Sequence, residues 1–388
     1  MAERSYLDWN ATAPLRDEAS AALAAALSLP GNPSSVHAEG RAARRAVERA
    51  REQVAALVGA RPGDVFFTSS GTEANMLALT PAIEVADDKR PRSRLLVSAI
   101  EHASVRAGGR FQRGALDEIP VAADGRVDLA ALAAAIAQSP RPLVSLMLAN
   151  NETGVIQPVA EAAALVHAAG GLLHVDAVQA VGRIDCDIAA LGADLLTLSA
   201  HKIGGPKGVG ALVRRNDDIH LPEPLIRGGG QERGLRAGTE NVAGIAAFGA
   251  AAAAARRERG REAAHMLALR GRLETGLRAI SPQATVFGAD AERLPNTTLF
   301  AAAGMKADTA VIAFDLEGVA VSSGAACSSG KVQASYVLAA MGVAPPLTRG
   351  AVRVSLGWST TEADIERFLT AWRKLATALS KDERGIAA

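Results

Sequence analysis

The sequence has little cysteine, few aromatic side chains and almost no net charge. Two of the 388 residues are cysteine, 3% are aromatic, and the formal net charge at pH 7 is +1. Cys186 and Cys327 cannot build a disulfide framework, and neither belongs to a C-x-x-C pair. The small net charge creates no long-range field for nucleic acid or an anionic membrane. These absences favour a reducing compartment and exclude a disulfide-rich or nucleic-acid-binding protein.

A signal peptide and long apolar runs are also missing. The first ten residues carry charges early and contain no apolar core of the kind that secretory signals need. The longest uncharged run, 242–255, is mostly alanine and is too short to span a bilayer. We therefore expect a soluble cytoplasmic protein with no membrane partner.

Apolar residues make up 49% of the chain, which is enough for a sizeable core. Through residue 213, strand-like apolar runs alternate with helical stretches. Strands are expected at 65–68, 94–99, 143–148, 171–175, 195–199 and 209–213. Helices are expected at 17–27, 36–58 (with Ser35 as its N-cap), 71–85, 129–137 and 159–169. This alternation predicts an α/β fold with a mainly parallel sheet covered on both faces.

A second, smaller α+β domain is expected after a long helix that starts at Asn241 and passes Arg278. Its predicted strands are 285–287, 297–301, 320–322 and 353–356, and its helices 308–316, 336–341 and 362–379. We place the boundary inside the long helix, which gives a large domain over 1–260 and a small domain over 261–388. The N-terminal arm, 1–16, is expected to pack on the small domain.

The chemistry is expected to centre on Lys202. An apolar strand ends in Ser-Ala-His-Lys at 199–202, and glycine and proline then turn the chain away. An amine held there and partly desolvated can form a Schiff base with a carbonyl. Taken alone, Lys202 could also be a solvated turn lysine, which is the expected role of Lys207 in its glycine-flanked turn.

Polar clusters follow several of the predicted strands, and parallel strands collect ligands at their carboxyl ends. These clusters are 68–72, His102, 150–154, 174–179, and the pair Ser199 and His201. Cluster 68–72 opens a helix whose free N–H groups can bind phosphate, but its hydroxyls could equally be ordinary N-caps. Asp176 could pair with a protonated ring nitrogen or cap the next helix. A turn could explain the asparagines of 150–154, and a lone His102 could be structural. Together the clusters match the needs of pyridoxal phosphate.

The sequence resembles the cysteine desulfurases of the class V aminotransferase group, in their NifS/IscS-like branch. The resemblance runs from 6–12 to 353–357. Its motifs are NNETG at 150–154, HVDAVQ at 174–179, SAHK at 199–202, RAGTEN at 236–241 and SSGAACSSG at 322–330. It implies the pyridoxal-phosphate-dependent transferase fold of type I, with a seven-stranded sheet in the large domain.

The same resemblance implies a role for each site residue. Lys202 holds pyridoxal phosphate as a Schiff base, and Asp176 pairs with its ring nitrogen. His102 stacks on the ring and takes part in catalysis, while Gln179 and Asn151 contact the ring hydroxyl or the substrate. The implied phosphate ligands are Gly71, Thr72, Ser199 and His201, with Thr239 contributed by the other subunit of a homodimer.

The resemblance further implies that Arg353 binds the substrate carboxylate as a bidentate pair. Cys327 lies in a Gly/Ser-rich segment and would take sulfur from L-cysteine as a persulfide, leaving L-alanine. Cys186 lies beside two aspartates, which disfavour a thiolate, so it is expected to be structural. An iron–sulfur scaffold or another sulfur acceptor is the implied partner, and no metal site is expected.

Several alternatives stay open. The same cofactor would serve a selenocysteine lyase or a class V aminotransferase, and a non-catalytic homologue could keep the fold to bind a partner. The chain departs from the family pattern at Ser70, Gly204, Ala325 and Val354. Its tail, 380–388, does not clearly match the scaffold-docking segment of relatives.

Overall fold

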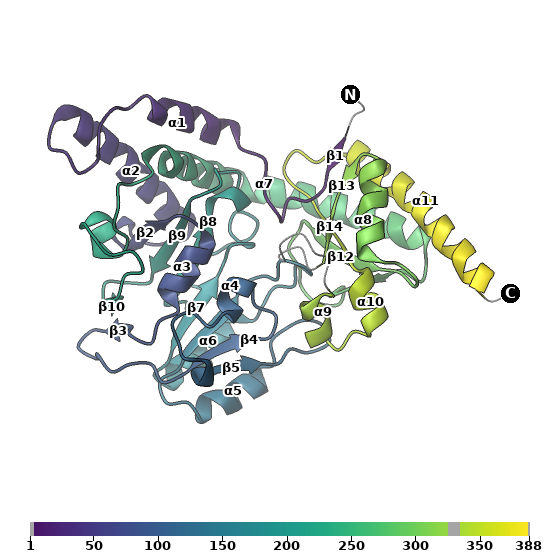
Figure 1. The fold of residues 1–388 in the computed structure, drawn as a ribbon, viewed down its shortest axis with the longest axis horizontal. Helices are drawn as coiled ribbons and strands as arrows, with labels where there is room; N and C mark the ends of the chain where they lie inside the picture. Colours follow the sequence, from purple (N-terminus) through teal and green to yellow (C-terminus); the bar gives the residue numbers. More distant parts are fainter. Residues whose placement is uncertain (1–3, 325–333, 387–388) are drawn as a thin grey trace.

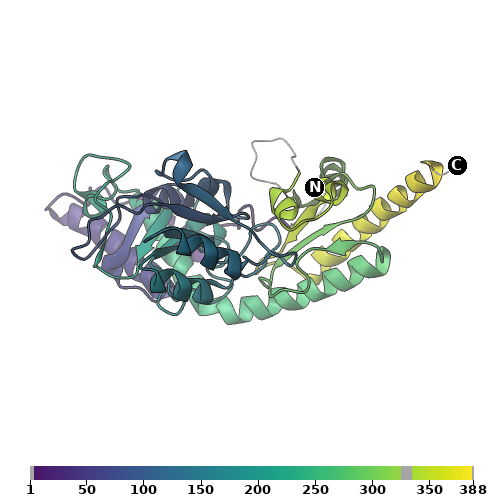
Figure 2. The same cartoon turned by 90° about the horizontal axis from the view of Figure 1, so that it is seen from below.

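The computed structural model describes the backbone of residues 4–324 and 334–386, and the side chains as far as residue 379. Cys327 lies outside the described residues. The described chain forms two parts, and one long helix, α7, runs from the first into the second (Figures 1 and 2). Among the described residues, no helix combines the length and apolar character that crossing a bilayer requires.

The first part is built on a seven-stranded sheet with the order β2-β9-β8-β7-β6-β4-β5. All neighbouring strands in it are parallel except β9, which runs antiparallel to both β2 and β8. Its strands are β2 (Val65–Thr68), β4 (Leu95–Ser98), β5 (Leu116–Ile119), β6 (Leu143–Met147), β7 (Leu172–Asp176), β8 (Leu195–Ser199) and β9 (Gly210–Arg214). The mainly parallel sheet predicted from the alternating pattern is confirmed.

Helices cover both faces of this sheet, because its strands are apolar on both sides. Neighbouring residues of β8 show the division: Leu196 packs into the larger core cluster, and Leu195 into a smaller cluster on the opposite face. The helices of the larger cluster are α1 (Asp17–Leu27), α2 (Ala38–Leu57), α5 (Leu129–Ala137), α6 (Val159–Ala168) and the first half of α7 (Val242–Ile280). The opposite face carries α3 (Gly71–Ala78) and α4 (Ala103–Arg106).

The second part holds an antiparallel sheet with the order β11-β12-β15-β14. Its strands are β11 (Thr285–Val286), β12 (Thr297–Ala301), β14 (Ser322–Ser323) and β15 (Val352–Ser355). Its helices are α8 (Ala307–Leu316), α9 (Tyr336–Ala340), α10 (Pro345–Gly350) and α11 (Glu362–Ile386). A separate core cluster fills this part and includes Phe300, Phe368 and Trp372. This is the α+β composition expected for the C-terminal part of the chain.

Two segments link the parts. Helix α7 contributes Phe248 to the first core and Leu273 to the second, so the predicted boundary near residue 260 falls inside a continuous helix. The N-terminal arm adds β1 (Ser5–Tyr6), which pairs in parallel with β13 (Val319–Ala320). The division into 1–260 and 261–388 stays a prediction.

The structure corrects several local predictions. Helix α2 is capped by His37, whose Nδ1 accepts from Gly40 N, and not by Ser35. Helix α3 ends at Ala78 because Pro81 follows, and residues expected at its end instead form β3 (Glu84–Val85), which pairs with β10 (Ile219–His220). The single strand predicted at 320–322 is divided between β13 and β14, and both β5 and α10 were missed.

Candidate active site

A cavity of about 560 Å³ lies at the carboxyl ends of β6, β7 and β8, where the helix α3 begins and the N-terminal arm passes. Its volume suits a cofactor with a small substrate. Most of the predicted site residues line it: Gly71, Thr72, His102, Asn151, Asp176, Gln179, Ser199, His201, Lys202 and Arg353. The structure therefore brings together residues that are far apart in the sequence, while their individual roles stay predictions.

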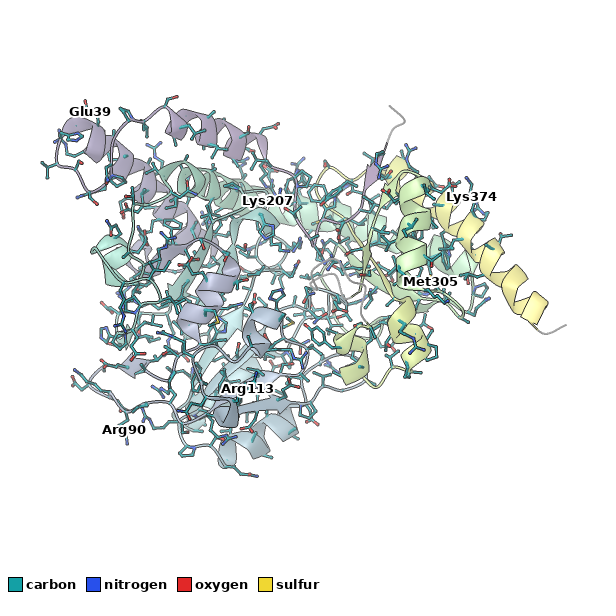
Figure 3. The ribbon with its side chains drawn as sticks, in the orientation of Figure 1. Glu39, Arg90, Arg113, Lys207, Met305 and Lys374 are labelled. Atoms are coloured by element: carbon teal, nitrogen blue, oxygen red, sulfur yellow. The ribbon has the colours of Figure 1, made fainter. Side chains whose placement is uncertain are left out.

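Lys202 ends a short 3₁₀ turn, η3 (Ala200–Lys202), directly after β8. Its Nζ donates to the backbone oxygens of Asn10, at 2.5 Å, and Ala11, at 2.8 Å. The sequence predicted the position of Lys202 at a strand end but not the short turn or these two carbonyls. Lys207, marked in Figure 3, also lines the cavity, so two lysines contribute to its wall.

Asp176 lies at the end of β7 and is held by two donors. Its Oδ1 accepts from Val178 N at 3.0 Å, and its Oδ2 accepts from Asn75 Nδ2 at 2.9 Å. The same nitrogen of Asn75 lies 2.9 Å from Ser104 Oγ, and Ser104 Oγ lies 2.8 Å from His102 Nδ1. A chain of polar contacts thus joins the predicted ring-nitrogen partner to the predicted ring-stacking histidine.

His174 lies two residues before Asp176 on β7 and is fully buried. Its Nδ1 contacts Ser145 Oγ at 2.8 Å, and its Nε2 contacts Thr197 Oγ1 at 2.9 Å. Burial lowers the pKa of His174 to about 4, and the charge of Asp176 only partly opposes this. His174 is therefore neutral at pH 7, and both of its ring nitrogens are engaged by hydroxyls.

The predicted phosphate end of the cavity is the start of α3. Ser70 caps this helix by accepting from Glu73 N at 3.1 Å, and Gly71 and Thr72 form its first turn. A Cβ on Gly71 would lie 3.3 Å from Ser199 Cβ and 3.1 Å from Val178 Cγ2, so a larger residue would crowd the cavity wall. Burial, reinforced by the charges of two lysines, lowers the pKa of His201 to about 4. An anion would find first-turn N–H groups and hydroxyls at this end.

The opposite end of the cavity carries Asn151 and Arg353. Asn151 Oδ1 is buried and has no hydrogen-bond partner among the described residues. Arg353 NH1 donates to the backbone oxygen of Asn151 at 2.9 Å, and NH2 forms an ion pair with Asp8 at 2.8 Å. The Nε atom of Arg353 is buried and also lacks a partner in the described part of the chain.

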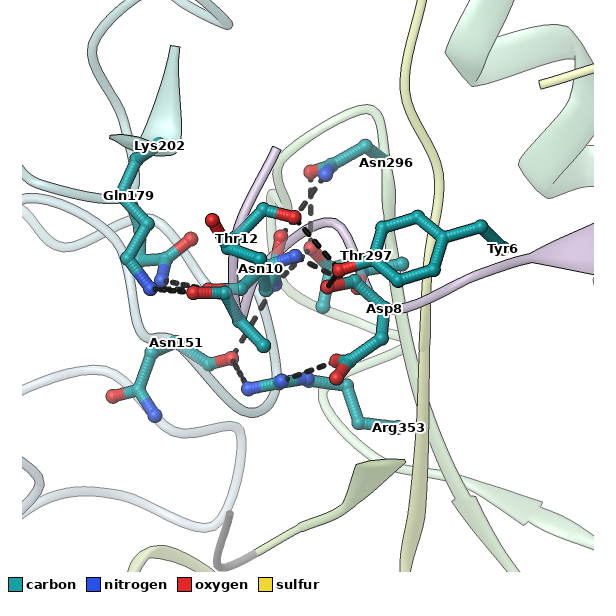
Figure 4. A network of polar contacts seen from close by, with 12 residues as sticks. Tyr6, Asp8, Asn10, Thr12, Asn151, Gln179, Lys202, Asn296, Thr297 and Arg353 are labelled. Atoms are coloured by element: carbon teal, nitrogen blue, oxygen red, sulfur yellow. Dashed lines mark hydrogen bonds and ion pairs between the residues drawn. The ribbon is translucent and has the colours of Figure 1, made fainter. Parts of the chain in front are cut away.

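Sequence reasoning missed the N-terminal arm as part of the site (Figure 4). Asn10 is buried, and its backbone oxygen accepts from Lys202 and from Gln179 Nε2, the latter at 2.9 Å. Its side chain bonds Thr297 Oγ1 at 2.9 Å and Asn296 Nδ2 at 3.0 Å. The available signal was a buried-type run, Tyr-Leu-Asp-Trp-Asn, that places Asp8 and Asn10 beside large apolar residues.

One predicted site residue, Thr239, lies outside this cavity. Thr239 is exposed and lines a neighbouring cavity of about 260 Å³ that shares Gly208 with the first, so it does not reach Lys202 within this chain. Cys327 falls on residues that the structure does not describe. Cys186 is buried, and desolvation raises its pKa to about 12, which agrees with a structural thiol.

The model of the aminotransferase class-V family matches residues 5–368. The chain belongs to this family. Its members depend on pyridoxal phosphate.

Relatives of this chain carry a more specific name. A cysteine desulfurase of Cereibacter sphaeroides is 46% identical over 375 residues, which cover 95% of this chain and 94% of the relative. An IscS-like cysteine desulfurase of Mycobacterium tuberculosis is 40% identical, with 94% of each chain covered. The structure of a NifS-like protein from Rickettsia africae superposes with a TM-score of 0.86 at 35% identity, covering 96% of this chain and 99% of that one. SspA, solved in complex with cysteine, gives a TM-score of 0.75 at 27% identity, over 92% of this chain and all of that one. The type I transferase fold implied by the sequence motifs is confirmed.

The residues present fit pyridoxal phosphate. The cavity offers an amine, a buried carboxylate held by two donors, an anion-binding helix start and the unpartnered Oδ1 of Asn151. These groups match the aldehyde, ring nitrogen, phosphate and ring hydroxyl of the cofactor in chemical type.

Proposed function

We propose that this protein is a pyridoxal-phosphate-dependent cysteine desulfurase, which converts L-cysteine to L-alanine and keeps the sulfur as a persulfide on Cys327. The observation that carries the proposal is one cavity lined by Lys202, Asp176 and Arg353. An amine, a ring-nitrogen partner and a carboxylate-binding guanidinium are the groups that chemistry on a free amino acid needs.

Different residues of the chain bind the cofactor, orient the amino acid and move its α-proton. Asp176 holds the proton of the ring nitrogen, and the start of α3 with Ser199 and His201 holds the phosphate. When bound, pyridoxal phosphate supplies an electron sink next to the α-carbon of the amino acid. Lys202 takes the α-proton. Its Nζ is then charged, and the backbone carbonyls of Asn10 and Ala11 accept hydrogen bonds from it. Arg353 and Asn151 orient the amino acid, and His102, fixed by Ser104, stacks on the ring.

The sulfur transfer balances without an external oxidant. The Cys327 thiolate attacks the sulfur of the substrate, so an S–S bond forms as the substrate's C–S bond breaks. The electron pair of the broken C–S bond stays on the β-carbon, which gains a proton and becomes the methyl group of alanine. Enzyme thiol and cysteine thus give enzyme persulfide and alanine.

We also propose a homodimer in which the exposed Thr239 completes the phosphate site of the other subunit, and a cytoplasmic location. A sulfur acceptor, such as an iron–sulfur scaffold protein, would then discharge the persulfide. The names of the relatives, cysteine desulfurase and IscS-like cysteine desulfurase, support the removal of sulfur from cysteine that such an acceptor would follow.

Incubation of the purified protein with L-cysteine tests the proposal. We expect alanine and protein-bound persulfide in equal initial amounts, and a Cys327→Ala variant that still binds the cofactor but forms neither product. Cys186→Ala serves as the matched control and should retain the activity. Undiminished turnover by Cys327→Ala would contradict the persulfide role. Pyruvate-dependent transamination by that variant would favour an aminotransferase, and much faster turnover of selenocysteine than of cysteine would favour a lyase.

A further inference from the structure

Arg353 is already engaged by a carboxylate of its own chain. It lies on β15 with 2% of its side chain exposed, and its NH2 is 2.8 Å from Asp8 Oδ1. Asp8 belongs to the N-terminal arm, and its backbone forms a β-bridge with Ser355 on the same strand as Arg353. The fold therefore fixes the Asp8 carboxylate next to this guanidinium (Figure 4).

Arg353 has a cationic and an anionic neighbour, Arg183 and Asp8. Arg183 is buried nearby, and its pKa is lowered to about 10, mainly by burial and also by the charge of Arg353. Arg183 donates to the backbone and side-chain oxygens of Gln179. Asp8 is the carboxylate that forms an ion pair with Arg353 among the described residues. The Nε of Arg353 is buried and has no partner in that part of the chain, and Arg353 lines the cavity.

We propose that Asp8 competes with the amino-acid carboxylate for Arg353 and so sets the affinity of the site. The inference rests on the proposed function, in which Arg353 binds the substrate carboxylate, and it deepens that assignment. An amino acid that binds Arg353 must share the guanidinium with Asp8 or displace it. Two carboxylates on one guanidinium repel each other, so Asp8 weakens the binding of substrate and product alike and favours release of L-alanine.

The size of the effect follows from the position of Asp8. About 20% of its side chain is exposed, so water partly screens its charge. We expect a moderate change of roughly two- to fivefold in affinity when the charge is removed.

The test is calorimetric titration of L-alanine into the full-length protein loaded with pyridoxal phosphate. Asp8→Asn keeps the size of the side chain and an oxygen that can accept from Arg353 NH2, but it removes the charge. Its dissociation constant for L-alanine should be about two- to fivefold lower than that of the wild type. Asp8→Ser removes the same charge with a smaller side chain, and it should change the affinity in the same direction even if Asp8→Asn does not fold. A residue that only stabilised the fold would not tighten binding when it is replaced.

Asp315→Asn is the matched control, because Asp315 is an exposed carboxylate that pairs with Arg4 of the same arm. It should bind L-alanine as the wild type does. Unchanged or weaker binding by both neutral Asp8 variants would overturn the proposal. An Arg353→Gln variant separates this from failure of the proposed function. If it binds L-alanine as tightly as the wild type, Arg353 is not the carboxylate site. If it binds weakly while the neutral Asp8 variants do not tighten binding, only the role of Asp8 is wrong.

Discussion

Asn75 Nδ2 lies 2.9 Å from Asp176 Oδ2 and 2.9 Å from Ser104 Oγ, so one buried amide fixes both the carboxylate and the support of His102. Asp176 ends β7, and Ser104 lies in α4, which follows β4. The geometry around the cofactor ring therefore depends on a side chain that does not need to touch the ring.

Replacing Asn75 should weaken cofactor binding. A hydrogen bond to a charged group contributes about 1.5–3 kcal/mol, so Asn75→Ala should raise the dissociation constant for pyridoxal phosphate by about tenfold or more. Equilibrium dialysis against the cofactor measures this. Asn216→Ala, which makes the same change on a turn outside the cavity, should leave the constant unchanged. Equal affinities for Asn75→Ala and wild type would contradict the role.

His174 should make stability depend on pH. Its folded-state pKa of about 4 lies below the unfolded value of about 6.5, so the unfolded chain binds more protons between these pH values. Neutral His174 therefore makes its full contribution to the free energy of unfolding above pH 6.5. As the pH falls towards 4, the free energy of unfolding decreases by up to roughly 3 kcal/mol.

Urea unfolding of the wild type and of His174→Gln at pH 7 and pH 5 checks this prediction. The wild type should lose more stability than the variant when the pH is lowered. Buried Glu101 acts in the opposite sense, because burial raises its pKa, so the informative quantity is the difference between the two proteins at each pH. A difference that does not change with pH would show that His174 titrates normally.

The pair Arg16–Glu262 should stabilise the connection between the arm and α7. Arg16 donates to both oxygens of Glu262 at 2.8 and 2.7 Å, both side chains are buried, and Arg16 Nε also donates to Ile203 O beside Lys202. Glu262→Ala would leave the Arg16 charge buried without its partner, at a cost of about 3–5 kcal/mol. We expect a clearly lower midpoint of chemical unfolding.

The exposed pair Glu18–Arg257 provides the comparison for that measurement. Glu18→Ala should leave the midpoint almost unchanged, because solvent-exposed pairs contribute little. Similar midpoints for Glu262→Ala and Glu18→Ala would mean that the buried pair does not stabilise the protein.

Most of the sheet could be predicted from the sequence. Its central strands are buried on both faces, so they appear in the sequence as mostly apolar runs such as 195–199. Strand β5 was missed because its Leu-Asp-Glu-Ile sequence lies at the sheet edge and is only partly buried. Strand β3 was missed because it pairs with a distant segment, a contact that local pattern does not encode.

The site shows the same limit. Residues that follow strands, such as Asp176 and Lys202, could be named from their sequence positions together with the family motifs. The contributions of Asn10 and Asp8 depend on where the arm passes, and that path is set by tertiary contacts with Thr297 and Ser355. Asn75 was missed for a related reason, because one asparagine within a helix gives no sign that it faces a carboxylate of another strand.

The most direct test of the account asks which amine carries the cofactor, because both Lys202 and Lys207 line the cavity. Borohydride reduction of the cofactor-loaded protein, followed by peptide mass spectrometry, locates the pyridoxyl group, with Lys202→Ala and Lys207→Ala treated in parallel. We predict the label on Lys202 in the wild type and in Lys207→Ala, and no label in Lys202→Ala. A label on Lys207 in the wild type, or one that survives in Lys202→Ala, would contradict the account.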